Sequence, residues 1–130
     1  MIVLDASAAL DWLLQTSAGQ SIEQRIYSRK ESLYAPHLID LEIAQVLRRL
    51  VREGTLSEQR ANEAIHDWLD LRITRYPHDA FLARIWQLRH NFSAYDAAYI
   101  TLAEELGAAL ITRDGRLASS PGSAAKVEVF

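Results

Sequence analysis

The chain has 130 residues, of which 49% are hydrophobic and 24% are charged, and its net charge is −3. This length suits one domain with a single core, and we expect residues 1–130 to form it. The absence of cysteine excludes disulfides and thiolate metal sites, so a metal site would have to use carboxylates or the four histidines.

Short apolar stretches, typical of buried strands, alternate along the chain with longer stretches of helical composition. We expect strands over residues 1–5, 33–35, 71–74, 108–112 and 126–130. We expect helices over residues 6–15, 21–30, 38–52, 57–71, 78–90 and 93–106, with a break at 17–20, a single turn at 114–117 and a loop turn at 121–123. This alternation predicts an α/β sandwich in which helices cover a parallel sheet.

The clearest helical pattern lies over residues 38–52. Its apolar residues recur at spacings of three and four, and Gly54 follows in the position where helices commonly end. By contrast, no apolar run approaches the roughly 18 residues of a membrane span. Asp5 and Asp11 argue against a signal peptide at the start, so we expect a cytoplasmic protein without a membrane partner.

Two acidic residues follow predicted strands. Asp5 ends the first strand, and Asp114 comes just after the strand over 108–112. Ligands of open α/β sheets bind beyond the carboxyl ends of the strands, so both residues point to the same rim of the molecule. The sequence by itself does not establish whether these two strands are neighbours.

Two further acidic residues stand at the borders of apolar helix faces. Glu42 lies beside the apolar stripe of the helix over 38–52, and Asp96 lies at the edge of the stripe over 93–106. Glu104 and Glu105 lie away from that stripe and are expected to be solvated.

Each of these four acids also has a purely structural explanation. Asp5 could cap the first helix, and Ser93 and Asp96 have the spacing of a capping box. Asp114 could cap the turn that follows it, and Glu42 could pair with a cation on its own helix, although positions 45 and 46 offer none.

Taken together, the four acids favour a site for a hard divalent cation. Mg²⁺ and Mn²⁺ prefer oxygen ligands, and a bound cation would offset the mutual repulsion of crowded carboxylates. A site of this kind can activate water and stabilise the leaving oxygen in phosphodiester cleavage.

The sequence resembles PIN-domain ribonucleases, specifically VapC-type toxins of toxin–antitoxin pairs, over essentially its whole length. The resemblance rests on three blocks: MIVLDASAAL at the start, then PHLIDLEIAQVL, then SAYDAAYITLAEELGAALITRDGRL. Gln45, where Asn is common, and Gly115, where a bulkier residue is usual, are small departures from the family pattern.

The resemblance implies a three-layer α/β/α sandwich with a short parallel sheet, in which the strands of Asp5 and Asp114 are adjacent. It implies a catalytic metal cluster of Asp5, Glu42, Asp96 and Asp114 that takes Mg²⁺ or Mn²⁺, supported by the hydroxyls of Ser7 and Thr112. The expected activity is hydrolysis of RNA by an endoribonuclease. The expected partners are a neutralising antitoxin and a second copy of the chain in a homodimer, within a larger toxin–antitoxin complex.

Other surfaces suggest contacts with these partners. The fourteen basic residues comprise twelve arginines and two lysines, and Arg113 and Arg116 could bind RNA phosphates, as could Arg48, Arg49 and Arg52. The last three could equally form the solvated face of their helix. An antitoxin groove could be lined by Trp12, Leu13, Leu14, Trp68 and Leu69, although aromatic residues at helical spacing are more often core. The four histidines lack metal-binding spacing and are expected at the surface.

Two alternatives come from other classes of protein. An aspartyl-phosphate protein would need a paired acid after the first strand and a strand-borne lysine, whereas the sequence has D-A-S and only Lys30 and Lys126. The second alternative is a degenerate PIN fold that binds partners without nuclease activity, and the intact set of four acids argues against it.

Overall fold

The computed structural model describes residues 1–130. Strands and helices follow one another in this order: β1 (Ile2–Leu4), α1 (Ala6–Leu13), α2 (Ser17–Ser28), β2 (Leu33–Pro36), α3 (Ile39–Arg52), α4 (Glu58–Asp70), β3 (Ile73–Tyr76), a short 3-10 helix η1 (Asp79–Phe81), α5 (Leu82–Gln87), α6 (Ala94–Leu106), β4 (Ala109–Thr112), α7 (Arg116–Ser119) and β5 (Lys126–Val129).

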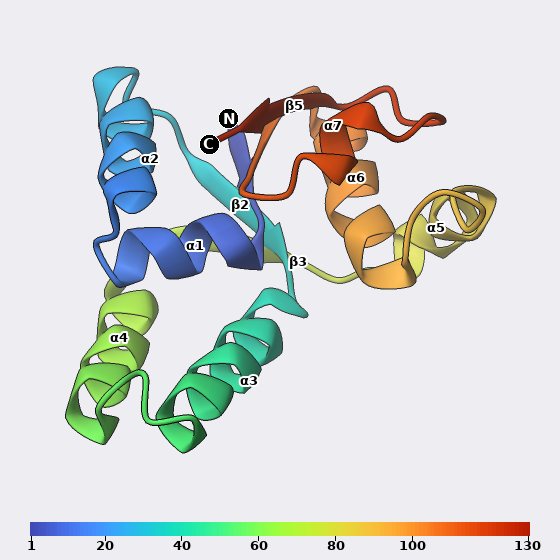
Figure 1. The fold of residues 1–130 in the computed structure, drawn as a ribbon. Coiled ribbons are helices and arrows are strands. Elements are labelled where there is room, and N and C mark those ends of the chain that lie inside the picture. Colours follow the sequence, from blue (N-terminus) through green and yellow to red (C-terminus); the bar gives the residue numbers. More distant parts are fainter.

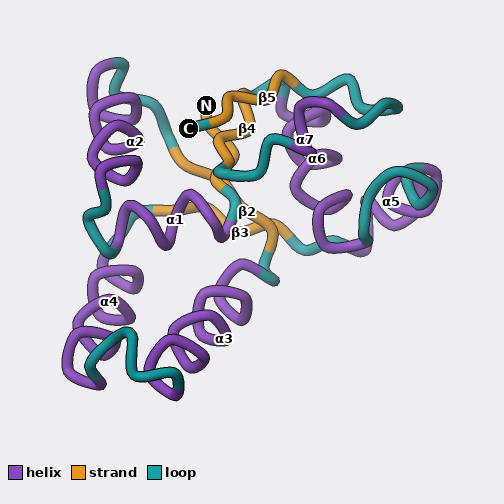
Figure 2. The backbone as a smooth tube through the Cα atoms, viewed as in Figure 1, coloured by secondary structure: helices purple, strands orange, loops and turns teal.

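The five strands form one sheet in the order β3-β2-β1-β4-β5, and every neighbouring pair is parallel. Helices α1 to α4 lie on one side of the strands and α5 to α7 on the other (Figure 1). Figure 2 shows the short strands between these two groups of helices. The predicted three-layer α/β/α sandwich is therefore confirmed, and β1 pairs directly with β4.

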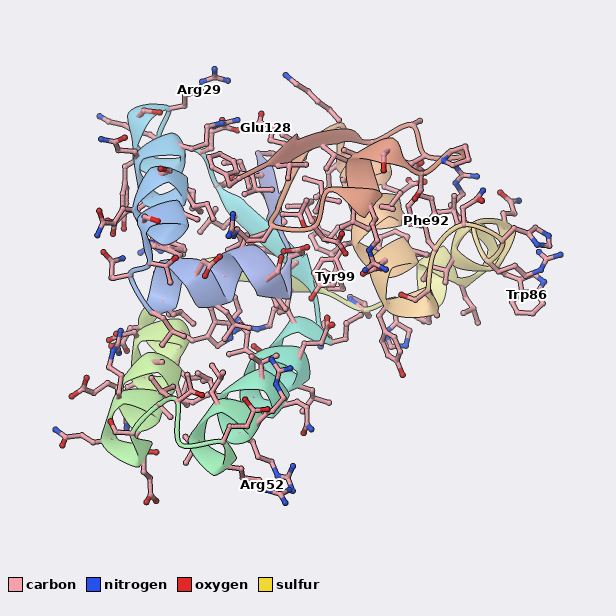
Figure 3. The ribbon with its side chains drawn as sticks, in the orientation of Figure 1. Arg29, Arg52, Trp86, Phe92, Tyr99 and Glu128 are labelled. Carbon is pink, nitrogen blue, oxygen red and sulfur yellow. The ribbon has the colours of Figure 1, made fainter.

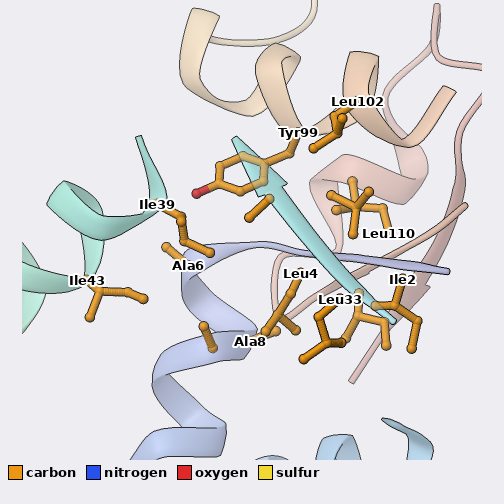
Figure 4. Packing of buried hydrophobic residues seen from close by; sticks show 14 of the residues in the cluster. Ile2, Leu4, Ala6, Ala8, Leu33, Ile39, Ile43, Tyr99, Leu102 and Leu110 are labelled. Carbon is orange, nitrogen blue, oxygen red and sulfur yellow. The ribbon is translucent and has the colours of Figure 1, made fainter. Parts of the chain in front are cut away.

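Strand β1 is an uninterrupted apolar run because both of its faces are buried in the core. Ile2, Val3 and Leu4 are all fully buried, as expected for a central parallel strand with helices on both faces. Figure 4 shows Ile2 and Leu4 among core side chains of α1, α3, α6 and the sheet. Helix α6 covers β1, β2 and β4 and is buried continuously from Ala97 to Ala103.

The predicted break at residues 17–20 is wrong, because α2 begins at Ser17. The Thr16 hydroxyl accepts a hydrogen bond from the Gly19 amide and caps the helix. Gly19 itself does not interrupt the helix but allows close packing: a Cβ there would lie 1.9 Å from the carbonyl oxygen of Asp11. Gly19, which falls within the predicted break, is thus the point of contact between α2 and α1.

Several other boundaries differ from the sequence prediction, three of them by more than the fraying of an end. The helix expected over 78–90 is divided into η1 and a short α5, and a turn replaces its last part. Strand β3 starts at Ile73 rather than at residue 71, because Leu71 serves as the C-cap of α4. The turn expected over 114–117 becomes the one-turn helix α7.

The surface features are consistent with most of the remaining expectations. All four histidines are exposed, and Gly54 adopts the positive φ predicted after α3. No helix combines the length and the apolar character that a membrane crossing requires.

Two fully buried threonines give a stability prediction. The Thr101 hydroxyl has no hydrogen-bond partner, whereas the Thr112 hydroxyl donates to Asp5. We expect Thr101→Val to raise the free energy of unfolding by about 1 kcal/mol, because it removes a buried hydroxyl that has no partner. Thr112→Val should lower it by about 1.5–3 kcal/mol, since a carboxylate would lose its donor. Urea denaturation of both variants measures the two free energies of unfolding. Equal changes would contradict the difference in hydrogen bonding between the two hydroxyls.

Candidate active site

The carboxyl edge of the sheet gathers the side chains that the sequence singled out. Asp5 follows β1 and Asp114 follows β4, which are paired neighbours. Glu42 lies in the first turn of α3, the helix that follows β2, and Asp96 lies in the first turn of α6. Helix α3 follows β2 and helix α6 leads into β4, so both begin at this end of the sheet, where four segments distant in sequence meet.

Asp5 is held more firmly than the other acids. Its side chain is only 7% exposed. One carboxylate oxygen, Oδ1, accepts hydrogen bonds from the Ser7 hydroxyl at 2.7 Å and from the Ala8 amide at 3.0 Å. The other oxygen accepts from the Thr112 hydroxyl. Asp5 therefore caps α1, as the structural explanation proposed, and at the same time joins β1 to β4.

The hydroxyls of Ser7 and Thr112 extend this network to the loop after β4. The Ser7 oxygen accepts a hydrogen bond from the Arg113 amide, and the Thr112 oxygen accepts one from the Asp114 amide, both at 3.0 Å. The two residues thus support the Asp5 carboxylate and fix the backbone that carries Asp114.

Glu42 is held by a partner that the sequence analysis did not identify. The Tyr99 hydroxyl of α6 donates to Oε1 of Glu42 at 2.6 Å. Figure 4 shows the Tyr99 ring projecting from α6 with its oxygen toward α3. The alternative of a cation on the same helix, which positions 45 and 46 already argued against, is wrong, because no basic residue pairs with Glu42. In the sequence Tyr99 belongs to the apolar stripe over residues 93–106, and only its hydroxyl could have signalled this role.

Asp96 lies in the first turn of α6, where it forms only one of the two hydrogen bonds of a capping box. The Ser93 hydroxyl accepts from the Asp96 amide at 3.1 Å, but no hydrogen bond joins the Asp96 side chain to the Ser93 amide. Burial raises the pKa of the Asp96 carboxyl, and the negative charge of Asp114 adds to this. The Ser93 hydroxyl and Arg116 act in the opposite direction.

Asp114 stands apart from the other three acids because it already has a cationic partner. Arg116 donates to both of its oxygens, and the Arg116 guanidinium holds the pKa of Asp114 below its usual range. The Arg116 amide also bonds to Asp114, which thus begins the turn into α7. Arg113 is likewise engaged, with Asp11 and with the main-chain oxygen of Phe130.

The other three carboxylates share one electrostatic environment. Burial raises the pKa values of Asp5 and Glu42 as it does that of Asp96. The charge of Asp96 acts on Asp5, and the charges of both act on Glu42, which further raises these pKa values. None of the three forms an ion pair with a lysine or arginine. The fold therefore collects negative charge here and supplies no direct cationic partner for these three acids, although Arg116, which is paired with Asp114, partly offsets the charge around Asp96.

This environment fits a hard divalent cation. No three acidic or histidine side chains are grouped closely enough to hold an ion among them directly. Mg²⁺, however, is commonly bound by one or two carboxylates, with water completing its octahedron. The oxygen-only donors and their uncompensated repulsion are the properties that such a cation would satisfy.

The antitoxin groove suggested by the sequence is wrong for most of its residues. Trp12, Leu13 and Trp68 are buried in the core, and the Trp68 indole donates to Asp40 at 2.6 Å. Leu69 is exposed on the outside of α4. The apolar spacing was a core signal, which was the other explanation considered.

Comparisons with known proteins show the family to which the chain belongs. A family model described as "PIN domain" matches residues 2–121. The chain is 44% identical to VapC ribonuclease Mb0985 of Mycobacterium bovis over 120 residues, covering 92% of this chain and 91% of the relative. It is 40% identical to ribonuclease VapC12 of Mycobacterium tuberculosis over 129 residues, covering 99% of this chain and 98% of the relative.

Solved structures share the fold at lower sequence identity. The protein PAE2754 of Pyrobaculum aerophilum superposes with a TM-score of 0.72 at 23% identity, covering 98% of this chain and 83% of that one. VapC20 of M. tuberculosis, described as a sarcin-ricin loop cleaving toxin, gives a TM-score of 0.64 at 18% identity, covering 92% of this chain and 94% of its own.

The contact between Tyr99 and Glu42 gives a second stability prediction. We expect Tyr99→Phe to lower the free energy of unfolding of the metal-free protein by about 1.5–3 kcal/mol, because a half-buried carboxylate loses its donor. Denaturation of Tyr99→Phe, Glu42→Ala and the double variant forms a double-mutant cycle that isolates the pair. Additive effects of the two substitutions would show that the hydrogen bond contributes nothing.

Proposed function

Since the chain belongs to the PIN-domain family and, within it, to the VapC ribonucleases, we propose that it is an endoribonuclease toxin whose reaction takes place at the carboxylate cluster. The observation that carries this proposal is the set of three unpaired acids, Asp5, Glu42 and Asp96, at the carboxyl edge of the sheet. The substrate is RNA, and the bond that is hydrolysed is a phosphodiester.

The cofactor we propose is Mg²⁺, with Mn²⁺ as a substitute. Asp5, Asp96 and Asp114 would hold it directly or through water, and Glu42 completes the cluster. When bound, such a cation lowers the pKa of a water molecule and stabilises the charge that develops on the leaving oxygen. For Asp114 to take part, its ion pair with Arg116 has to open.

The chain's own residues orient the reacting groups. Three donors fix both oxygens of Asp5, so its carboxylate cannot rotate. Tyr99 occupies only Oε1 of Glu42, which leaves the other oxygen available to accept a hydrogen bond from the attacking water. The raised pKa of Glu42 suits a group that takes a proton from that water.

Arg116 and Arg113 differ in how easily they could meet an RNA phosphate. The Arg116 side chain is 79% exposed and is held by Asp114 alone, so a phosphate could compete for it when Asp114 turns to a cation. Arg113 is bound to Asp11 and to the end of the chain, and its contact with RNA would require both to be released.

The proposed protein partners are an antitoxin that covers the site and a second copy of the chain. An apolar hollow between the start of α3, α5 and α6, lined by Leu82 and Tyr95 among others, supports the homodimer. Leu82 and Tyr95 are exposed, as is Trp86 one turn after Leu82 on α5, and Figure 3 shows Trp86 pointing outward from that helix. A cytoplasmic location, where the RNA substrate is found, belongs to the same proposal, as does treating residues 1–130 as one PIN domain.

Substitution of the acids tests the nuclease. We expect Asp5→Asn and Asp96→Asn to abolish cleavage of total cellular RNA by the purified protein in Mg²⁺, and EDTA to have the same effect on the unsubstituted protein. Glu105→Gln, on the exposed side of the same helix as Asp96, is the matched control and should cleave normally. Folded Asp5→Asn or Asp96→Asn protein that retains full activity would refute the proposal. A chain that binds partners but cuts no RNA would instead be the degenerate PIN module.

Cation binding is tested separately from catalysis. Mn²⁺ at 100 times its Kd should stabilise the protein by about 2.7 kcal/mol, because it binds the folded state alone. Asp96→Asn should be more stable than the unsubstituted protein without metal, since one repelling charge is gone, and should gain less from Mn²⁺. Thermal unfolding with and without Mn²⁺ measures both effects. Equal gains in the two proteins would show that Asp96 holds no cation.

A further inference from the structure

Helix α3 carries a group of arginines that the carboxylate cluster does not use. Arg48, Arg49 and Arg52 are all exposed, and together with Gln45 and Glu53 they line a shallow hollow on the surface. None of the three arginines forms an ion pair or a side-chain hydrogen bond with another residue. Figure 3 shows Arg52 projecting from the end of α3.

The group is distinguished from the other arginines by the combination of missing ion pairs and close spacing on one helix. Six of the twelve arginines in the chain form ion pairs with acidic residues: Arg25, Arg60, Arg75, Arg84, Arg113 and Arg116. Half of the remaining six stand within five residues of one another on a single helix. In a chain with a net charge of −3, this is a concentrated local patch of positive charge.

The position of the group along α3 relates it to the proposed site. Glu42, Gln45, Arg49 and Arg52 are separated by three or four residues, so they follow one stripe of the helix. At the rise of an α-helix, Arg49 lies about 10 Å and Arg52 about 15 Å along the axis from Glu42. The stripe therefore starts at the carboxylate cluster and leads away from it into positive charge.

A polyanion that approaches this acidic rim needs attraction from somewhere else on the surface. Arginine binds phosphate with two parallel hydrogen bonds, and unpaired arginines release counterions from the strand when they do so. We propose that Gln45, Arg48, Arg49 and Arg52, the arginine ridge, bind the phosphate backbone of single-stranded RNA on one side of the bond to be cut. This inference rests on the proposed function for the nature of the ligand.

The ridge also has a simpler explanation in the stability of α3. Arg49 and Arg52 lie in the last turn of the helix, where positive charge interacts favourably with the helix dipole. That explanation accounts for neither Arg48 nor the absence of acidic partners. The helix-dipole explanation predicts that replacing these arginines changes the stability of the protein but not its affinity for RNA. A binding measurement therefore separates it from the proposal.

The test is RNA binding without catalysis. A labelled, unstructured RNA of about 20 nucleotides exceeds the span of a single-strand site. Its anisotropy is followed in EDTA over a range of KCl concentrations, with the RNA shown to be intact afterwards. We expect Arg48→Gln/Arg49→Gln/Arg52→Gln to weaken binding about tenfold and to reduce the slope of log affinity against log salt by about 2, since each phosphate contact on a single strand contributes about 0.7.

Two further triple variants serve as matched controls. One removes the same number of charges elsewhere on the surface, and the other keeps the charge of the ridge but not its guanidinium groups. Arg29→Gln/Arg72→Gln/Arg89→Gln removes three exposed arginines without ion pairs from other elements, and its affinity should remain normal. Arg48→Lys/Arg49→Lys/Arg52→Lys retains the charge and should retain the salt slope. If both glutamine variants lose the same affinity, only net charge matters and the ridge is refuted.

Unchanged affinity and salt slope in the ridge variant would also overturn the inference, and would be the result if the ridge served a protein partner or the helix dipole alone. RNA cleavage in Mg²⁺, measured in parallel, keeps the two proposals separate. An unsubstituted protein that cuts no RNA refutes the nuclease. The RNA-binding curves measured in EDTA would still show whether the arginine ridge binds RNA.

Discussion

The buried carboxylate of Asp5 is the interaction on which the organisation of the site depends. It links the end of β1, the start of α1 and the end of β4 through the Ala8 amide and the hydroxyls of Ser7 and Thr112. These donors offset the cost of removing a charged group from water. The same two hydroxyls also accept hydrogen bonds from the amides of Arg113 and Asp114, so they set the position of the loop after β4 as well. Structure and proposed catalysis thus use one residue, and its capping role does not compete with its role in the site.

The carboxylates around Asp5 repel one another, and the fold does not neutralise this repulsion with direct ion pairs. Asp96 and Glu42 bring two more charges to the rim, and the chain pairs neither with a base, although it pairs acids such as Asp40 and Glu104 elsewhere. Burial raises the pKa of both carboxyls and so favours their neutral forms. Arrangements that oppose stability in this way are characteristic of functional sites, because an external ion or substrate can supply the missing interaction.

The sequence predicts those features of the fold that have a local cause. Apolar β1 followed by Asp5, the stripe of α3 and the cap at Ser93 each have a signature in neighbouring residues, so their placement could be predicted. The bond from Tyr99 to Glu42 could not, because it joins residues 57 positions apart and depends on how α6 packs beside α3. Gly19 was misassigned for a related reason. Glycine in a loop and glycine at a helix crossing look alike until the partner, here the Asp11 carbonyl, is known. The four acids could be proposed together from their placement, but the adjacency of the strands that carry Asp5 and Asp114 came only from the family resemblance.

The strand order has a consequence for how this activity comes into being during synthesis. β1 occupies the centre of the sheet, yet its neighbour β4 is synthesised much later: Asp5 and Thr112 are 107 positions apart. Until then β1 has one open edge, and Asp5 lacks the hydroxyl of Thr112. Asp96, Tyr99 and Asp114 arrive equally late. A chain that has not yet added β4 to the sheet therefore cannot assemble the carboxylate cluster, because the elements that carry its four acids come together only when α6 and β4 have folded against β1.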